Sequence, residues 1–523
     1  MNSLVQYIII LSYIRGMRQL FQNKGKKILL STFVIIIILC FSQITHASVN
    51  SGGVLVNVKQ FGAKGDGTTN DTKSINKAFT SISKTNGTVF FPAGDYLVNI
   101  TITVPKGVSI SGEGRGSTTI KRIDTSNTAI FNLKGKQNII GIGFKSRINL
   151  YPTGDDISLV DCSITGTTQG IQNAATIKRL TIARTLFDSC GYGFLSNNNP
   201  SYDVTIRDCT FINSTADDVE INSPSERFLI QNCSFKDNKS KYINSGFGIG
   251  VAVHAKDITI NNCNFLNIAC QAIHCEGNSF VNITNCSFKN SGRDNHPGSP
   301  HSDIAFLSSA KGNISDCVFI KSDIGYASMG IYSNNSIIKE CKFYEKWCGY
   351  SSDYYNCKFY GDASIVAGKR IGKGIDSPSA KKIVSDCQFF NLSVGVQFGY
   401  LGGGSYGGTV QNCLFTNCDL GVASRRTSTM IYAGADEVVK NNLFKSCVVG
   451  VSLPNGGDAP RRNYTVVDNL FSRCLTNLIL GTYIPGYKRL VSNNVEVTVQ
   501  ANVKSDKTVD IYDLVMASKN VGK

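Results

Sequence analysis

The sequence has few charged residues, and long amphipathic helical patterns are nearly absent from its 523 residues. Only 17% of the residues are Asp, Glu, Lys or Arg, whereas 42% are hydrophobic. A chain that is disordered as a whole would show the opposite balance, so disorder is excluded. The missing helical periodicity argues against a mainly helical fold. The 50 glycines and the many asparagines instead indicate a β-rich chain with many turns.

The N-terminal segment predicts export. Five basic residues precede the apolar run 28–41, and the small residue Ala47 follows it as a cleavage candidate. We therefore assign residues 1–47 to a leader and signal peptide. We expect a secreted, extracellular protein with no stable membrane span after cleavage. The alternative is an uncleaved membrane anchor through residues 28–45.

The charge of the chain favours an anionic partner. The net charge is +16, and removing residues 1–47 takes away five basic and no acidic residues, which leaves 48 basic and 37 acidic residues, or +11. In an exported protein this excess favours acidic glycans or an anionic cell wall. We expect no nucleic-acid partner, because export and the lack of a groove-reading element argue against one.

One short pattern recurs along the chain: alternating apolar residues, then Asn or Asp, Cys, any residue and Phe. Four clear copies end at Phe211, Phe235, Phe265 and Phe288, and the repeated position recurs on average about 26 residues apart. A unit this small cannot bury its own apolar face, so its neighbours must stack on it. The repeat therefore predicts an all-β solenoid of about 12–13 coils, each with about three short parallel strands.

The cysteines follow the repeat rather than a disulfide framework. Ten of them share one repeat position, which Asn442 and Asn469 occupy later, and a second column follows the repeat Phe. A position that alternates with Asn is a packing position, where Cys acts as a small hydrophobe. We therefore predict mostly free, buried thiols, although disulfides are usual in exported proteins. The two columns are Cys162, Cys209, Cys233, Cys263, Cys286, Cys317, Cys341, Cys357, Cys387 and Cys413, and Cys190, Cys418, Cys447 and Cys474.

Residues 48–125 carry a distinct opening unit. FGAKGDGTTND at 61–71 is followed by a helical pattern that Asp71 can cap, then by GTVFFPAGDYLV at 87–98 and GVSISGEG at 107–114. This unit resembles the pectate-lyase-like superfamily, which includes rhamnogalacturonase-like enzymes, epimerases and phage tailspikes. The resemblance implies a right-handed parallel β-helix with a short N-terminal helix cap, and it predicts the fold better than the reaction. Residues 126–491 continue the β-helix, and residues 492–523 are predicted to be a closing strand and tail.

The second strand of each coil is the predicted site of chemistry. If the apolar residues at positions 219, 251, 273, 304 and 331 point inward, the residues beside them point outward. This alignment places His254 next to Glu276 and puts Glu220 and His274 two coils apart. All four histidines after residue 47 also fall within 48 residues. The predicted catalytic residues are Asp218, Glu220, His254, His274 and Glu276.

Two reactions fit these residues. Asp218 and Glu220 on one side of a strand, about 6.6 Å apart at the backbone, suit the acid and base of glycosidic hydrolysis. His274 or Tyr332 could instead move a proton in β-elimination or C5-epimerisation of a uronate. No cofactor is required, and calcium is left open. The predicted substrate-binding residues are Asp217, Asp303, Tyr332 and a basic ridge of Arg425, Arg426, Arg461 and Arg462; Asp303 is also a candidate metal ligand.

The alternative to a catalytic role is that the exposed Asp, Glu and His residues only keep the surface of the sheet soluble. Of the polygalacturonase motifs, only the pair Asp217-Asp218 is present, and Gly-His-Gly and Arg-Ile-Lys are not. Pectin hydrolysis by that machinery is therefore not expected. We predict an exported glycoside hydrolase or polysaccharide lyase that acts on an acidic glycan. The alternative is a non-catalytic cell-surface or tailspike-like glycan-binding protein, and a homo-oligomer is left open.

Overall fold

The computed structural model describes most of the chain between residues 53 and 497. The described ranges are 53–124, 126–240, 245–252, 254–293, 301–321, 329–333, 335–349, 352–362, 364–366, 369–376, 381–399, 407–424, 436–454, 463–481 and 488–497. The predicted signal peptide and the four arginines of the predicted basic ridge lie outside these ranges. Among the described residues, no helix has the length and apolarity that a membrane crossing needs.

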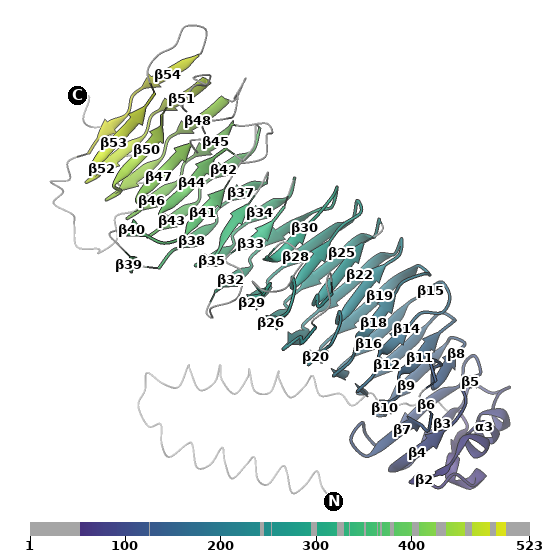
Figure 1. Ribbon diagram of the computed structural model, residues 1–523. Coiled ribbons are helices and arrows are strands. Elements are labelled where there is room, and N and C mark those ends of the chain that lie inside the picture. The colour runs from purple at the N-terminus through teal and green to yellow at the C-terminus, as the bar shows by residue number, and fades with distance from the viewer. Residues whose placement is uncertain are drawn as a thin grey trace, which may run out of the picture. The chain divides into compact units, whose positions relative to one another are not determined.

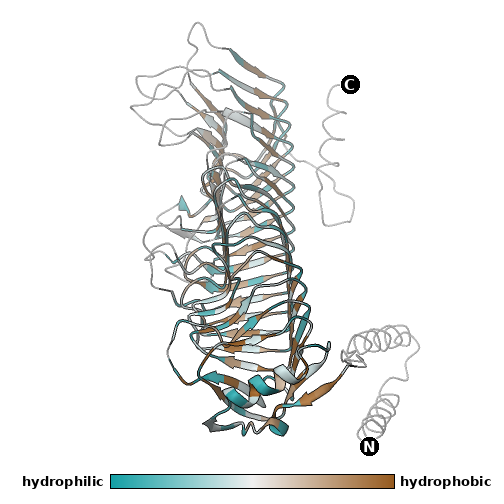
Figure 2. Cartoon of the chain, turned by 90° about the vertical axis from the view of Figure 1, so that its right-hand side faces the viewer, coloured by the Kyte–Doolittle hydropathy of each residue, from teal (hydrophilic) through white to brown (hydrophobic). Residues whose placement is uncertain are grey.

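Three long parallel sheets make up the described part of the chain, as expected for a parallel β-helix (Figure 1). Sheet A runs from β1 (Leu55–Asn57) to β54 (Arg489–Ser492), and sheet B runs from β2 (Asp66–Asn70) to β55 (Val495–Glu496). Figure 2 shows the rungs stacked on one another, with apolar segments recurring from rung to rung. Each strand pairs with the strand of the next coil, so the core runs the length of the stack.

Sheet C carries the candidate site. Its sixteen strands are β5 (Ile102–Val104), β8 (Phe131–Leu133), β11 (Ile148–Pro152), β14 (Gln169–Gln172), β18 (Tyr192–Ser196), β21 (Val219–Asn222), β24 (Ile249–Ala252), β27 (Ile273–Cys275), β30 (Ser302–Phe306), β33 (Met329–Tyr332), β36 (Trp347–Gly349), β41 (Lys373–Asp376), β44 (Val394–Phe398), β47 (Leu420–Ser424), β50 (Val449–Leu453) and β53 (Thr476–Leu480). The predicted number of 12–13 coils is therefore too low. The opening unit, which the repeat count left out, already contributes strands to all three sheets.

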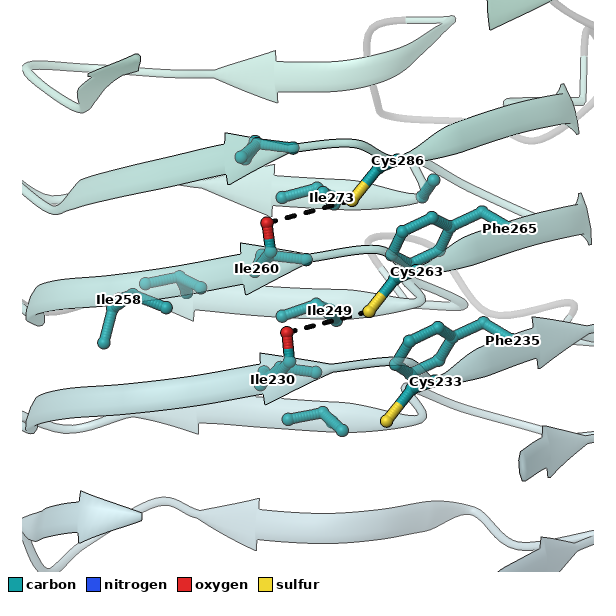
Figure 3. Close-up of a cluster of buried hydrophobic side chains, with 14 of the residues drawn as sticks. Ile230, Cys233, Phe235, Ile249, Ile258, Ile260, Cys263, Phe265, Ile273 and Cys286 are labelled. Carbon is teal, nitrogen blue, oxygen red and sulfur yellow. Dashed lines mark hydrogen bonds between the residues drawn. The ribbon is translucent and has the colours of Figure 1, made fainter. Parts of the chain in front are cut away.

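The repeat pattern builds the core. The repeat phenylalanines stack with ring centroids 4.5–5.1 Å apart and with ring planes within 10° of parallel. Beside them, repeat thiols donate hydrogen bonds to carbonyls of the preceding coil, for example Cys263 Sγ to Ile230 O at 3.7 Å (Figure 3). The prediction of free thiols is confirmed for the 17 described cysteines, of which only Cys474 is partly exposed.

The Asn or Asp before each repeat Cys has a backbone role. Asp208, Asn232, Asn262 and Asn285 adopt the left-handed conformation, with φ between 52° and 57°. Asn and Asp tolerate this conformation better than other residues with a side chain. These residues turn the chain from a strand of sheet A into a strand of sheet B once per coil, which explains why the repeat retains them.

The predicted helix in the opening unit is present as α3 (Thr72–Ser81). Its apolar side buries Ile75, Ala78 and Phe79, and the Phe79 ring packs edge-on against Phe131 of β8. The side chain of Asp71 does not cap this helix. It instead accepts hydrogen bonds from the backbone N–H groups of the preceding glycine-rich turn at 2.7 and 3.0 Å. That α3 closes the end of the β-helix stays a prediction.

Candidate functional site: an acidic cleft on sheet C

The outward residues of sheet C form columns along the stack. In one column, Leu195 lies beside Glu220, Glu220 beside Gly250, and Gly250 beside His274; Ala305 and Tyr332 continue this column. The separation of Glu220 and His274 by two rungs is therefore confirmed. A second column places Ala252 beside Asn222.

The register predicted for β24 is wrong by two residues. Ile249, not Val251, aligns with Val219 and Ile273. The predicted contact between His254 and Glu276 is lost as a result. His254 instead lies beyond the end of β24 in an exposed turn with φ of 63°. Both Ile249 and Val251 are apolar and point inward, so the sequence alone offered two equivalent registers.

Two carboxylates predicted to face outward are buried instead. Asp218 is fully buried and accepts a hydrogen bond from Ser214 Oγ. Asp303 is also fully buried, and its Oδ1 accepts a hydrogen bond from Lys346 Nζ at 3.0 Å. Asp218 lies before β21 begins at Val219, where the alternation of a strand does not apply. The prediction that both residues are exposed on the outward face was therefore wrong, since Asp303, inside β30, is buried with Lys346, and neither residue lines the cleft described next.

An open cleft of about 630 Å³ lies on the outward face of sheet C. Three carboxyl groups and one imidazole line it, contributed by Asp217, Glu220, Glu276 and His274. The remaining lining residues are Gln169, Tyr192, Leu195, Asn197, Asn222, Phe247, Gly250, Val251, Ala252 and Leu307. The cleft thus combines titratable groups with amides and an aromatic ring, a combination typical of ligand sites. Among the described residues, no group of three or more His, Cys, Asp or Glu side chains is placed to hold a metal ion.

Asp217 and Glu220 form a proton-sharing pair. Asp217 Oδ1 accepts hydrogen bonds from the backbone N–H groups of Gly246 at 2.7 Å and Phe247 at 2.8 Å. Burial raises the pKa of Asp217 to about 6, against the opposing effect of these N–H groups. Burial, the Asp217 charge, the Glu276 charge and a hydrogen bond with Asp217 together hold the pKa of Glu220 well above its usual range. The shared proton therefore resides mainly on Glu220 at neutral pH.

Gly250 gives the Glu220 carboxyl its position. A Cβ atom at residue 250 would collide with Glu220 Oε2. The carboxyl group therefore lies over the glycine of the next rung, which brings it to one rung, about 5 Å, from the backbone of His274. A glycine in the middle of a strand often marks such a close approach.

His274 is oriented by three neighbours. Its Nδ1 lies 3.2 Å from Gln271 Oε1, its Nε2 lies 3.7 Å from Glu276 Oε2, and its ring stacks on Phe247 with centroids 4.2 Å apart. The Nδ1 side of the ring therefore faces an amide oxygen, and the Nε2 side faces the Glu276 carboxylate. The hydrogen bond from His274 lowers the pKa of Glu276, so Glu276 is the carboxylate of the cleft that stays ionised.

The sequence missed Tyr192, Phe247, Gln271 and the pairing role of Asp217, which it had assigned to substrate binding. Burial, together with the Asp217 and Glu220 charges, raises the pKa of Tyr192 to about 12. Tyr192 pairs with Gln169 on the neighbouring rung, and both line the cleft. Strand alignment could have found Tyr192, whereas no sequence signal marked Phe247, which contacts His274 from the neighbouring coil, or Gln271, which contacts it within the same coil.

Tyr332 and four arginines are the remaining predicted substrate-binding residues. Tyr332 continues the Glu220 column but is not a lining residue. Arg425, Arg426, Arg461 and Arg462 lie outside the described residues. Two further basic residues make ion pairs within the chain: Arg370 with Asp419 at 2.7 Å, and Lys373 with Asp376 at 3.0 Å.

The buried carboxyl groups should make the protein more stable at mildly acidic than at neutral pH. The pKa values of Asp217 and Asp303 are raised to about 6, and those of Asp218 and Glu220 lie well above their usual range, with burial as the main cause. In the unfolded chain these groups titrate near their ordinary pKa of about 4. The folded state therefore binds more protons, and the free energy of unfolding falls as the pH rises from about 4 through 6.

We expect the thermal midpoint measured by calorimetry to be higher at pH 5 than at pH 8. The general charge of the chain also changes with pH, so the matched comparison is Asp218→Asn, which removes one buried carboxyl group and should reduce the difference. An equal pH dependence in this variant would contradict the prediction.

Comparison with known proteins points to one superfamily. Residues 55–293, which include the whole Asp217–Glu276 cluster, match the family described as rhamnogalacturonase A/epimerase, pectate lyase-like. The chain is 30% identical over 216 residues to the mannuronan C5-epimerase AlgE4 of Azotobacter vinelandii, a match that covers 38% of this chain and 37% of the epimerase. It is 42% identical over 76 residues to alginate lyase 7 of the same organism, covering 13% of this chain and 9% of the lyase.

The matches cover only part of the curated relatives, between 5% and 37% of the length of the first six. Among solved structures, the A-module of the Azotobacter vinelandii mannuronan C-5 epimerase AlgE6 aligns with 85% of this chain and 100% of that module, at 16% identity and a TM-score of 0.31. The family match and the stacked parallel sheets agree with the resemblance seen in the sequence. Residues 55–293 thus match a pectate-lyase-like family, and the described part of the chain has the stacked parallel sheets of a parallel β-helix.

Proposed function

We propose that the protein is a polysaccharide-active enzyme that breaks glycosidic bonds by acid–base chemistry in the cleft on sheet C. One observation carries the proposal: the proton-sharing pair of Asp217 and Glu220 faces His274 and Glu276 across Gly250. Burial and neighbouring charge raise the pKa of Glu220, while that of Glu276 is lowered. Two carboxyl groups whose pKa values are pushed apart are what an acid and a base require.

Hydrolysis is the reaction that the charge of the cleft favours. Its transition state resembles an oxocarbenium ion, which is positively charged and is stabilised by carboxylates placed around it. Protonated Glu220 would donate its proton to the leaving oxygen, and Asp217 would help to return it. By the spacing of the sheet, the carboxyl group of Glu220 over Gly250 lies about 8 Å from the backbone of Glu276. An inverting glycosidase places its two carboxyl groups about 6.5–9.5 Å apart with a water between them, so the proposal requires the Glu276 carboxyl group to keep a separation of that size from Glu220.

The second candidate is a reaction at C5 of a uronate, in which His274 Nε2 removes the C5 proton and Glu220 donates a hydrogen bond to the sugar carboxylate. In β-elimination the C4–O bond then breaks and water protonates the leaving oxygen, whereas in C5-epimerisation water returns a proton to the opposite face of C5. Gln271 and Phe247 hold the His274 ring in the cleft. The names of the relatives, a mannuronan C5-epimerase and an alginate lyase, support this class. An acidic glycan and export are part of the proposal for either reaction, and they rest on the net charge and on the N-terminal segment.

The test is to incubate the protein, beginning at Ser48, with neutral and uronate polysaccharides that include mannuronan and 1,3-linked glucan. Three signals are followed in parallel: new reducing ends, absorbance of unsaturated uronates, and deuterium incorporation at C5 in heavy water. We expect reducing ends without unsaturated products.

If the absorbance rises together with the reducing ends, the reaction is elimination and not hydrolysis. If deuterium incorporation is the only signal, the reaction is epimerisation. Parallel samples with a chelator test whether calcium is needed. If all three signals stay at background while one glycan column retains the protein, the function is glycan binding without catalysis.

A further inference from the structure

We propose that Trp347 forms a second sugar-binding subsite on sheet C, where its indole stacks on a hexopyranose ring of the glycan held in the cleft. This inference rests on the proposed function, because it assumes that the cleft binds another sugar unit of the same glycan. The subsite consists of Trp347, Met329, Tyr332 and Gly349, none of which lines the cleft.

Trp347 lies on the same face of sheet C as the cleft. In β36, Cys348 is fully buried and aligns with Ile331 and Ile375, so Gly349 faces outward. An irregularity in the register pairs Trp347 with Met329, and the Trp347 ring lies over the outward side of Gly349. Gly349 aligns with Tyr332, the residue that continues the column of Glu220 and His274. The subsite and the cleft therefore share one continuous strip of the sheet.

The indole lies against the sheet rather than standing up from it. A Cβ atom on Gly349 would meet Trp347 Cζ3 at 3.0 Å and Cη2 at 3.6 Å. The six-membered ring therefore covers the glycine, and the Met329 methyl group lies 3.6 Å from the same point. Trp347, Met329 and Tyr332 are all partly exposed. A flat aromatic ring with partial exposure is the shape on which the apolar face of a pyranose packs.

The distance between cleft and subsite fits a continuous glycan. Three rungs separate His274 from Gly349, with Ala305 and Tyr332 between them. At the spacing of parallel strands this is about 14 Å. The spacing of one rung is close to the length of one hexose unit in an extended glycan. A glycan with one unit at His274 therefore reaches Trp347 with about its fourth unit. The small side chain of Ala305 leaves room for the chain to pass.

The next rung supplies polar groups for the hydroxyls of the same sugar. Lys373 Nζ lies 3.0 Å from Asp376 Oδ2 in β41, and Asp376 aligns with Gly349. The Lys373 side chain retains 37% of its exposure, so it can donate to a hydroxyl or a carboxylate without breaking its ion pair. An aromatic floor with a charged pair beside it would bind a sugar ring in a fixed orientation.

Trp347 is the single tryptophan of the chain, so its intrinsic fluorescence reports on this subsite alone. The probes are oligomannuronates and 1,3-linked oligoglucosides, from disaccharides to hexasaccharides, titrated into the protein carrying Glu220→Gln so that they are not consumed. We expect the emission to shift with tetrasaccharides and longer chains and to stay unchanged with disaccharides.

Kinetics on the protein with Glu220 intact give the second readout. Trp347→Ala should lower kcat/KM for hexasaccharides about ten-fold and leave disaccharides unchanged, while Trp347→Phe should retain most of the activity. The subsite would be overturned if Trp347→Ala lowered kcat/KM equally for oligosaccharides of every length. It would also be overturned if a hexasaccharide that the protein turns over left the Trp347 emission unshifted. A length-dependent shift without any turnover would reject the proposed function and keep the subsite. No shift with any probe would reject the subsite whether or not turnover occurs.

Discussion

Replacing Glu220 by glutamine should lower turnover about 10³-fold and leave the fold intact. Glutamine keeps the size of the side chain and its hydrogen bond to Asp217, but it cannot give up a proton. The desolvated carboxyl group is also removed, so the thermal midpoint should be unchanged or higher at neutral pH. The measurement is the initial rate on the polysaccharide identified in the panel, together with the midpoint from calorimetry.

The matched control is Glu226→Gln in β22 (Glu226–Gln231), where the carboxyl group pairs with Arg227 at the exposed surface. This variant should keep the wild-type rate, because Glu226 lies outside the cleft. A Glu220→Gln protein with more than about a tenth of the wild-type rate would contradict the role of Glu220 as the acid.

Gly250→Ala tests the position of Glu220 without changing its chemistry. The added methyl group must displace the Glu220 carboxyl group, since the two cannot occupy the same space. Gly250 does not need a left-handed conformation, so the backbone accepts alanine. A displacement of about 1 Å at the acid should lower kcat about 10²-fold. An unchanged pH profile with an unchanged rate would show that the close approach at Gly250 has no part in catalysis.

Replacing Lys346 by methionine should destabilise the fold by about 3–5 kcal/mol. Lys346 and Asp303 form an ion pair in which both side chains are fully buried. Burial raises the pKa of Asp303 to about 6, although Lys346 acts against this rise. Without Lys346 the pKa of Asp303 rises further, so at neutral pH the folded state must either bind a proton at this carboxyl group or keep a buried charge without its partner, and both reduce stability. The loss should appear as a lower thermal midpoint at pH 8.

Two controls separate lost charge pairing from lost packing. At pH 5 Asp303 takes up a proton, so the loss caused by Lys346→Met should be smaller than at pH 8. The double variant Asp303→Asn/Lys346→Met removes both charges and should recover most of the midpoint. An equally large loss in the double variant would mean that the packing of Lys346, not its charge, stabilises this part of the core.

The sequence was a good guide wherever one residue type recurs at one place in every coil. The positions of Cys263 and Phe265 could be assigned to the core because the same pair returns in neighbouring coils, and Asn262 marked the turn before them. Stacked coils impose the same environment on equivalent positions, so the pattern itself carries the structural information. The confirmed separation of Glu220 and His274 followed from this regularity.

The sequence was a poor guide wherever a coil departs from the repeat. Asp217 and Asp218 precede the first residue of β21, so their side chains follow the turn and not the strand: Asp217 reaches Glu220, and Asp218 turns into the core. In β24, two inward apolar residues made two registers equally acceptable. The placement of Glu220 over Gly250 depends on a contact between coils that no local pattern encodes.

By itself, therefore, the sequence determined the stacked β architecture, the free thiols and the stretch of chain on which the titratable residues lie. These properties depend on composition and period, which act locally and repeat in every coil. Only the tertiary structure decided which carboxyl groups share a proton, which are buried, and which face His274. The physical reason is that burial and charge coupling depend on distances set by the turns and by contacts between coils, which the repeat pattern does not encode.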